Sequence, residues 1–215
     1  MTVKLIIFDL DGTLVDSIDD LVSATNHVRA IYGRSPYGRE DVRAILGQGG
    51  QRLIEQALEG ASPAELARAL ELYIAYNAEH LLDRTALFPG VRETIARLAA
   101  DGMRMAILSN KHSMLSRKML EGLGLDGYFA VVHGPDSLPW RKPSPEPVLR
   151  LLADFGVATT EGVIVGDSIN DVAAGRNAGI CTVGCSYGYG DPAELADADY
   201  RIASLPEFLQ LPLFG

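Results

Sequence analysis

Two aspartates near the N-terminus are the residues whose types and spacing say most about chemistry. Asp9 and Asp11 follow the short apolar run Leu5 to Phe8 and precede Gly12, which allows a tight turn close to a ligand. Two carboxylates this near each other repel unless a cation or a proton lies between them. The pair therefore indicates a divalent metal site or an acid–base dyad. The alternative is a solvated acidic loop, which fits less well directly after a buried strand.

A second pair of carboxylates occurs late in the chain. Asp167 and Asp171 follow the apolar run 162–165 and stand four residues apart at the start of a predicted helix, so they share a face of it. Helix N-termini also favour acidic residues as caps, and this simpler explanation suits Asp171 better than Asp167. The pair is a candidate for completing a metal site.

A hydroxyl and an amide follow another apolar run. Ser109 and Asn110 come directly after the predicted strand 103–108. The Ser109 hydroxyl and the neighbouring backbone amides suit phosphate oxygens, although a simple helix cap explains the serine equally well.

Lys142 is the candidate cation. It precedes Pro143 and Pro145, which restrict the backbone, and a helix is predicted to start after them. A lysine held still beside a carboxylate and a phosphate neutralises both. Lys111 is the rival among the four lysines of the chain.

These residues fall at the ends of predicted strands. From Gly90 the chain alternates helices and strands, the pattern of a doubly wound (Rossmann-like) parallel sheet. The carboxyl ends of parallel strands meet at one edge, so we expect Asp9, Ser109 and Asp167 to converge there. The predicted strands are 5–8, 103–108, 128–132, 162–165 and 181–183.

An all-helical segment interrupts this pattern. Residues 16–88 carry only helical periodicity, broken by glycines and by Ser62-Pro63. We therefore predict an α/β core domain of residues 1–15 and 89–215 and an inserted helical cap domain of residues 16–88. The two crossings lie close to the acidic loop, which is a plausible place for a hinge.

Composition limits the class of protein. The chain has 215 residues, of which 47% are hydrophobic and 22% charged, enough for a buried core. Its net charge of −9 argues against a nucleic-acid partner. No apolar run resembles a signal peptide or a membrane span, so we expect a cytoplasmic protein with no membrane partner. Two cysteines are too few for a disulfide scaffold, and both are expected to be reduced.

The motif Asp9-Leu-Asp-Gly-Thr-Leu-Val-Asp-Ser17 resembles the first motif of the haloacid dehalogenase-like superfamily. Members of this superfamily mostly hydrolyse phosphate esters with Mg²⁺. The resemblance extends over nearly the whole chain and is closest to the phosphoglycolate phosphatase branch. It implies a Mg²⁺ cofactor and a small phosphorylated metabolite as the substrate.

The resemblance also implies roles for individual residues. Asp9 would be the nucleophile, Asp11 the acid and base for the leaving group and water, and Lys142 the catalytic cation. Asp171 would support the metal directly, through water or through Lys142. The expected metal site consists of Asp9, Asp11 (through its backbone carbonyl), Asp167 and Asp171. The expected phosphate-binding residues are Thr13, Ser109 and Asn110.

A glycine-rich segment of the predicted cap is similar to the cap loop of phosphoglycolate phosphatases. It runs from Val42 to Ile54 and contains Gly49, expected at the substrate, and two arginines. Arginine can meet a carboxylate with two hydrogen bonds. Arg52 is the expected reader of the substrate carboxylate, with Arg43 on the preceding helix as the other candidate.

Within the superfamily the residues favour a phosphatase. An acid at Asp11 fits a leaving group that needs a proton, unlike in the dehalogenases, and residues 16–83 contain no lysine for the Schiff base of phosphonate-cleaving relatives. We therefore expect a Mg²⁺-dependent phosphomonoesterase with an aspartyl-phosphate intermediate, foremost a phosphoglycolate phosphatase, acting as a monomer or homodimer. A β-phosphoglucomutase-like mutase, or a phosphatase for another sugar phosphate or a nucleotide, remains the alternative. A phosphometabolite-binding regulator is expected to lack a catalytic carboxylate, and none is missing.

Overall fold

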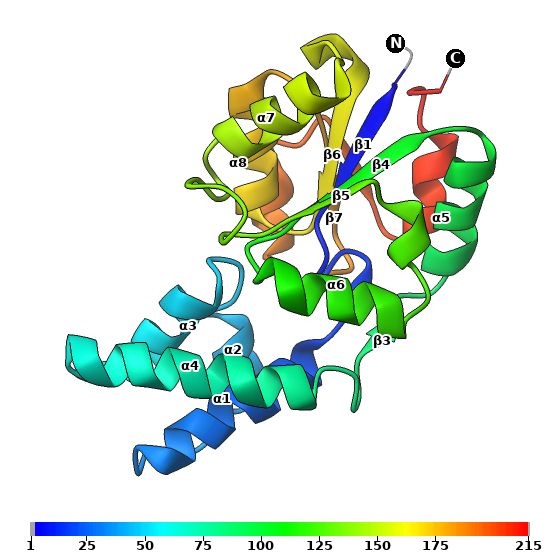
Figure 1. Cartoon of the computed structure of the whole chain (residues 1–215). Helices are drawn as coiled ribbons and strands as arrows, with labels where there is room; N and C mark the ends of the chain where they lie inside the picture. The colour runs from blue at the N-terminus through cyan, green and yellow to red at the C-terminus, as the bar shows by residue number, and fades with distance from the viewer. Residues whose placement is uncertain (1–2, 215) are drawn as a thin grey trace.

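A computed structural model describes residues 3–214 and is built on a six-stranded parallel sheet (Figure 1). The strand order is β5-β4-β1-β6-β7-β8, and every neighbouring pair is parallel. The first strand lies inside the sheet and the chain winds outward on both sides, which is the doubly wound arrangement that the sequence predicts. The strands are β1 (Leu5–Phe8), β4 (Arg104–Leu108), β5 (Val131–His133), β6 (Gly162–Gly166), β7 (Cys181–Cys185) and β8 (Tyr200–Ile202).

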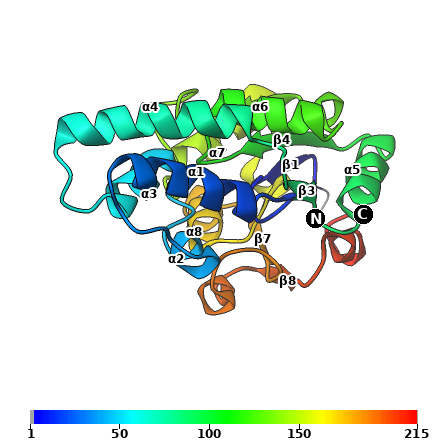
Figure 2. The same ribbon diagram turned by 90° about the horizontal axis from the view of Figure 1, so that it is seen from below.

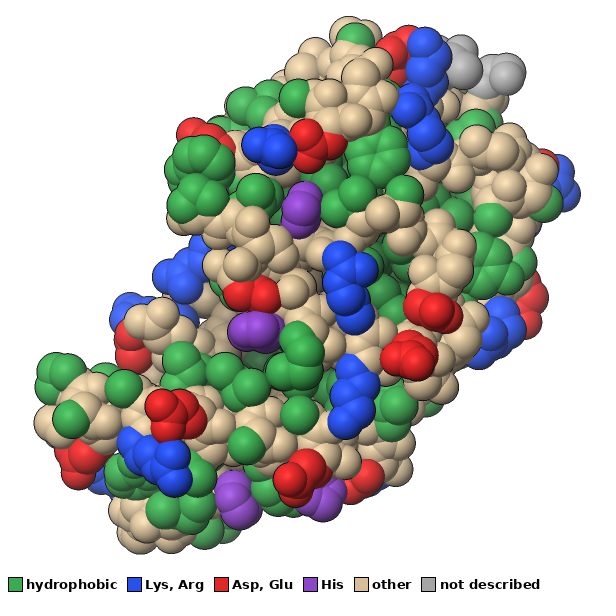
Figure 3. All heavy atoms as spheres, viewed as in Figure 1, with side chains coloured by type: hydrophobic (Ala, Val, Ile, Leu, Met, Phe, Trp, Pro, Cys, Tyr) green, Lys and Arg blue, Asp and Glu red, His purple; other side chains and the backbone are tan. Residues whose placement is uncertain are grey.

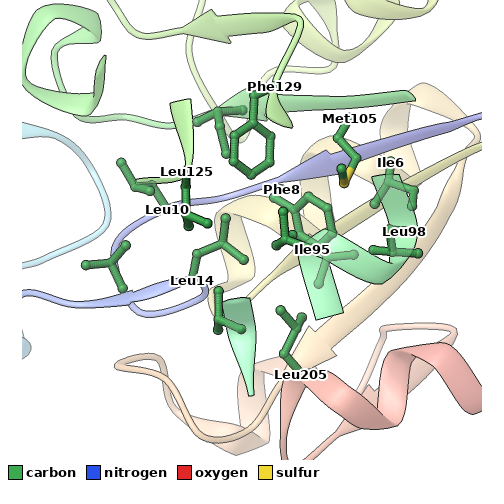
Figure 4. Packing of buried hydrophobic residues seen from close by; sticks show 14 of the residues in the cluster. Ile6, Phe8, Leu10, Leu14, Ile95, Leu98, Met105, Leu125, Phe129 and Leu205 are labelled. Carbon is green, nitrogen blue, oxygen red and sulfur yellow. The ribbon is translucent and has the colours of Figure 1, made fainter. Parts of the chain in front are cut away.

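Helices cover both faces of the sheet because β1 is apolar on both sides. Ile6 and Phe8 belong to one buried cluster, and Leu5 and Ile7 to the other. Phe8 meets the ring of Phe129 edge-on, with 6.3 Å between the centroids (Figure 4). Helices α5 (Val91–Ala100) and α6 (Ser113–Gly122) complete the first cluster, and α7 (Glu146–Phe155) and α8 (Ile169–Ala178) the second. The predicted fold class is therefore confirmed.

Helices α1 to α4 form a separate lobe beside the sheet (Figure 1). They have a hydrophobic cluster of their own, whose buried members run from Leu21 to Tyr73. Figure 2 shows the longest of them, α4, on the same side of the molecule as α6 of the sheet domain, the two following one another along that side. The helices are α1 (Ile18–Ile31), α2 (Arg39–Arg43), α3 (Gly50–Ala57) and α4 (Pro63–Glu79). The separate cluster supports the predicted cap, whose exact boundaries stay a prediction.

A two-stranded ribbon joins the lobe to the sheet domain. Strands β2 (Val15–Asp16) and β3 (Ala86–Leu87) pair antiparallel, so both crossings pass through one narrow connection. Next to it, the buried Asp20 carboxylate accepts hydrogen bonds from the Thr85 hydroxyl at 2.7 Å and the Thr85 amide at 2.9 Å. This connection lies where the sequence predicts a hinge.

The short strands β2 and β3, at the limits of the segment 16–88, are not predicted by its helical periodicity, and one predicted strand of the sheet begins later than expected. The sequence favours a strand over 128–132, whereas the structure has a 3₁₀ helix at Asp126–Tyr128 and begins β5 at Val131. The Tyr128 amide donates to the Leu125 carbonyl at 3.1 Å, and that tight turn removes it from the sheet ladder. The other 3₁₀ helices are η2 (Thr159–Glu161), η3 (Pro192–Leu195) and η4 (Leu205–Gln210).

The surface carries charges of both signs. Figure 3 shows acidic and basic side chains interspersed over the sheet domain and the helical lobe on the face in view. Among residues 3–214, no helix combines the length and the apolar character needed to cross a bilayer.

The two termini lie at one end of the sheet and the helical lobe lies at the other (Figure 1). The end of the sheet that faces the lobe is therefore the one far from the termini.

Candidate active site

The carboxyl ends of the central strands meet at the edge that faces the helical lobe. Phe8 of β1 lies opposite Ile107 of β4 and Val165 of β6, so the residues that follow each strand emerge side by side. A cavity of about 780 Å³ opens there between the sheet edge and the lobe. From the predicted site it is lined by Asp9, Asp11, Gly49, Ser109, Asn110 and Asp167.

Lys142 lies at the centre of the carboxylates. Its Nζ is 2.9 Å from Asp9 Oδ1 and 2.6 Å from Asp171 Oδ1, and its side chain is only 2% exposed. Burial works against the ammonium charge, yet Asp171 and Asp9 outweigh it and raise the pKa of Lys142 above its ordinary value. The Lys142 carbonyl accepts from Asn110 Nδ2 at 3.0 Å, which fixes the backbone of the lysine to the loop after β4.

Asp171 is fully engaged by its neighbours. Its Oδ2 accepts from the Ser168 amide at 3.1 Å and the Ser168 hydroxyl at 2.7 Å, and its Oδ1 faces Lys142. Asp171 therefore caps α8 and holds the lysine. Of the three ways in which the sequence predicts it to act, the structure shows the contact with Lys142, and the Asp171 carboxylate also belongs to a cluster of acidic oxygens that could hold a metal.

Asp9 and Asp167 form a site that fits a divalent cation. Oxygens of Asp9, Asp167 and Asp171 lie within 4.8 Å of one another, and hard carboxylate oxygens are what Mg²⁺ prefers. Burial raises the pKa of Asp9 to about 6 despite Lys142, and burial together with the Asp9 charge raises the pKa of Asp167 to about 7. Apart from its ion pair with Lys142, Asp9 Oδ1 has no hydrogen-bond partner among residues 3–214. A bound cation would favour the charged forms of Asp9 and Asp167 and would give Asp9 Oδ1 a further partner.

Asp11 has a different cation. Lys111 Nζ lies 3.2 Å from Asp11 Oδ2, and the Ser17 hydroxyl donates to Asp11 Oδ1 at 2.5 Å. The two lysines that the sequence treats as rivals thus hold different aspartates: Lys142 holds Asp9 and Lys111 holds Asp11.

Thr13 and Ser109 lie at the sheet edge in different settings. Thr13 is completely buried, and its hydroxyl donates to Asp167 Oδ1 at 3.1 Å. The Ser109 hydroxyl accepts from the Lys111 amide at 3.2 Å and borders the cavity. Ser109 therefore faces the cavity, where the sequence predicts the phosphate to bind. Thr13 is not among the described residues that line the cavity and contacts the Asp167 carboxylate instead.

The loop after β7 contributes residues to which the sequence assigns no role. The amides of Tyr189 and Gly190 donate to Asp167 Oδ2 at 2.7 and 3.3 Å. A Cβ on Gly188 would collide with Asp167 and with the Gly12 carbonyl. The aromatic and glycine alternation from Tyr187 to Gly190 is the only sequence signal for this loop, and pattern alone does not reveal its contacts 22 residues away.

Gly188→Ala is therefore expected to displace Asp167, lowering the phosphate-ester hydrolysis that the sequence predicts at least about tenfold and weakening the binding of a divalent cation, measured by isothermal titration calorimetry. Gly127→Ala is the matched control, because a Cβ at Gly127 meets nothing within 4 Å. Equal activity and equal metal affinity in both variants would contradict this role of Gly188.

The helical lobe contacts the sheet edge through two cap segments. Arg43 Nε donates to the Tyr189 carbonyl at 2.6 Å. Asn110 Nδ2 donates to the Gly47 carbonyl at 2.8 Å, and a Cβ on Gly49, whose φ is +88°, would lie 2.8 Å from the Asn110 carbonyl. Glycine at position 49 thus allows the cap loop to reach the core.

The two candidate arginines lie in different places. Arg43 borders the cavity but is committed to main-chain carbonyls of the loop after β7. Arg52 pairs with Glu55 at 2.8 Å, is half exposed, and is not among the described residues that line the cavity. Substrate reading by Arg52 stays a prediction, and the geometry of the described chain gives it no support.

Known proteins resemble this chain over nearly its whole length. The family model described as Haloacid dehalogenase-like hydrolase matches residues 6–185. A phosphoglycolate phosphatase of Chromobacterium violaceum is 37% identical, covering 97% of this chain and 96% of that protein. The crystal structure of a predicted phosphoglycolate phosphatase from Haemophilus somnus has a TM-score of 0.92 at 31% identity, with 98% of each chain covered. CbbY from Rhodobacter sphaeroides, solved in complex with phosphate, has a TM-score of 0.81 at 27% identity, with 96% of each chain covered.

Proposed function

Because this chain belongs to the haloacid dehalogenase-like hydrolase family and is a phosphoric monoester hydrolase, we propose that it hydrolyses 2-phosphoglycolate with Mg²⁺ as its cofactor. The observation that carries the proposal is the environment of Asp9, a largely buried carboxylate at a strand end whose buried Oδ1 has one lysine and no further partner among residues 3–214. The relatives named phosphoglycolate phosphatase support the choice of substrate.

In the proposed reaction Asp9 attacks phosphorus and the bond to the ester oxygen breaks. Asp11 gives its proton to the departing alkoxide, which leaves as glycolate. Asp11 then takes a proton from water, whose oxygen attacks the aspartyl-phosphate and frees Asp9 and inorganic phosphate. The Lys142 ammonium orients Asp9 and stabilises the charge on the phosphoryl oxygens, while Ser109 and Asn110 bind those oxygens.

The metal would be held by Asp9, Asp167 and the backbone carbonyl of Asp11. When bound, Mg²⁺ offsets the repulsion between a phosphate and the carboxylates of the site. Thr13, Tyr189 and Gly190 position Asp167 by hydrogen bonds to its two oxygens, so the chain itself supplies the outer support that such a ligand needs.

Removing the metal is expected to stop the reaction. Dialysis against a chelator should lower phosphate release to background and Mg²⁺ should restore it, whereas Ca²⁺ should restore little because its looser, higher coordination positions Asp9 less strictly. The measurement is phosphate release with and without each cation. Full activity in the presence of chelator would refute the metal requirement.

The substrate proposal is tested by a screen for phosphate release over small phosphorylated metabolites. We expect 2-phosphoglycolate to have the highest kcat/KM. The same samples are assayed for isomerisation of sugar phosphates, because a phosphosugar mutase shares the core residues. Isomerisation without phosphate release would replace hydrolysis by mutase activity, and a higher kcat/KM for a sugar phosphate or nucleotide would replace the substrate.

A further inference from the structure

The cavity contains a buried polar side chain that the proposed chemistry does not use. Asn77 of α4 is only 2% exposed and borders the cavity, yet neither its Nδ2 nor its Oδ1 has a hydrogen-bond partner among the described residues. Buried amides are almost always hydrogen-bonded, because a lost partner is costly in a place that water does not reach. An unpaired amide at a cavity wall points to a ligand that accepts or donates its missing hydrogen bonds.

Tyr73 lies one turn earlier on the same face of α4. Its hydroxyl is near the Asn77 amide without the geometry of a hydrogen bond, and burial raises the pKa of Tyr73, so it stays a proton donor. Gly50 makes room for the ring, since a Cβ there would lie 3.2 Å from Tyr73 Cε1. The ring therefore packs beside the cap loop that contacts the core, which brings the hydroxyl to the cavity.

Lys111, in the loop after β4, supplies a positive charge from the sheet domain to the cavity wall. Three lysines and arginines of the described chain line the cavity: Arg43, Lys111 and Arg141. Arg43 is occupied by main-chain carbonyls and Arg141 is exposed at the rim, whereas the Lys111 side chain is only 7% exposed. Lys111, which pairs with Asp11, is thus the most buried of these three cations in the cavity wall.

The position of Lys111 also limits the length of the substrate. Its Nζ lies 3.2 Å from Asp11, the residue that gives its proton to the leaving oxygen in the proposed reaction. A group read by Lys111 must therefore lie close to the ester oxygen. In 2-phosphoglycolate a single carbon separates the ester oxygen from the carboxyl group, whereas longer acids place the carboxylate beyond this reach. Apolar side chains such as Leu53, Leu70 and Ile74 form other parts of the wall and offer no hydrogen-bond partner to the hydroxyl groups of a polyol.

We propose that Lys111, Tyr73 and Asn77 form a subsite for the substrate carboxylate, with Lys111 on the core and the other two on α4 of the lobe. The inference rests on the proposed function and deepens it. The carboxylate accepts from the lysine, the phenol and the amide together, so it bridges the lobe and the sheet edge. Recognition is then shared by a helix in the lobe and the loop after β4, and does not require Arg52.

The test compares 2-phosphoglycolate with ethyl phosphate, which has a methyl group in place of the carboxylate. We expect wild type to prefer 2-phosphoglycolate in kcat/KM. Asn77→Leu should raise KM for 2-phosphoglycolate about tenfold, the loss of one hydrogen bond to a charge, and leave ethyl phosphate within about twofold. Lys111→Met should lower the ratio of the two kcat/KM values about a hundredfold. The ratio is the readout because Lys111 also contacts Asp11.

Matched controls separate recognition from folding. Tyr73→Phe removes only a hydroxyl and should reduce the preference about threefold to tenfold. Tyr76→Phe should not, because the Tyr76 ring stacks on His27 and His80 and is not among the described residues that line the cavity. Lys4→Met, at a surface ion pair with Glu161, is the control for Lys111→Met. A preference that persists in the Lys111, Tyr73 and Asn77 variants overturns the subsite alone. A wild type without the preference overturns both the subsite and the proposed substrate.

Discussion

Asp9→Asn is expected to reduce turnover to below about a hundredth of wild type while the fold persists. An amide does not attack phosphorus, so no covalent intermediate forms, yet it occupies almost the same volume at the end of β1. Lys142 keeps its contact with Asp171 at 2.6 Å, so its charge stays paired. The change thus removes the proposed nucleophile with little disturbance of its surroundings.

Asp9→Asn is also expected to change the stability of the fold, and the direction of that change follows from the pKa of Asp9. Burial raises the pKa of Asp9 to about 6, above the ordinary range of an aspartate. A carboxyl group whose pKa is raised by folding stabilises the fold below its unfolded pKa, and this contribution is lost as the pH rises through the folded value. Near pH 7.5, without metal, a neutral asparagine should therefore keep or raise the melting temperature.

The measurements are phosphate release in Mg²⁺ and thermal melting in chelator. Asp101→Asn is the matched control, since Asp101 is exposed and, among residues 3–214, forms an ion pair only with Arg97, at 2.8 Å. Activity above about a hundredth of wild type in Asp9→Asn would contradict a covalent role for Asp9. A large fall in melting temperature would mean that the variant tests folding and not catalysis.

Local pattern accounts for the parts of the site that lie at strand ends. The apolar run Leu5 to Phe8 predicts a buried strand, and a strand of a parallel sheet must end at the edge where other strands end. Asp9 and Ser109 are consequently predictable as neighbours, although 100 residues separate them. Lys142 is predictable from its Lys-Pro context only through resemblance, because no periodicity brings that loop to β1.

Contacts between distant loops are beyond such patterns. Whether Thr13 faces phosphate or Asp167, and whether Lys111 holds Asp11 or points to solvent, depends on how the loops after β1, β4 and β7 pack together. The same is true of the cap arginines. Arg52 stands beside the glycine-rich loop in sequence, yet helix α3 turns it toward Glu55. A polar residue on a mostly apolar helix, such as Asn77, is recognisable as functional only when its missing partner is seen.

Lys142→Met is expected to have the second large effect, and on stability as well as on activity. The lysine is 2% exposed and lies between Asp9 and Asp171, so its removal leaves two buried carboxylates without a cation. Breaking a buried ion pair in this way costs about 3–5 kcal/mol of the free energy of unfolding. Loss of a fixed positive charge beside the transferring phosphoryl group should lower kcat about a hundredfold or more.

A double variant separates the two consequences. Asp171→Asn keeps an oxygen for the Ser168 amide and hydroxyl, so α8 remains capped, while one of the stranded charges disappears. Lys142→Met combined with Asp171→Asn should therefore regain part of the lost melting temperature but none of the lost kcat. Lys4→Met, remote from the site, controls for the loss of a lysine. If the double variant regained activity together with stability, Lys142 would serve the fold alone, and the charge beside Asp9 would have to come from another residue.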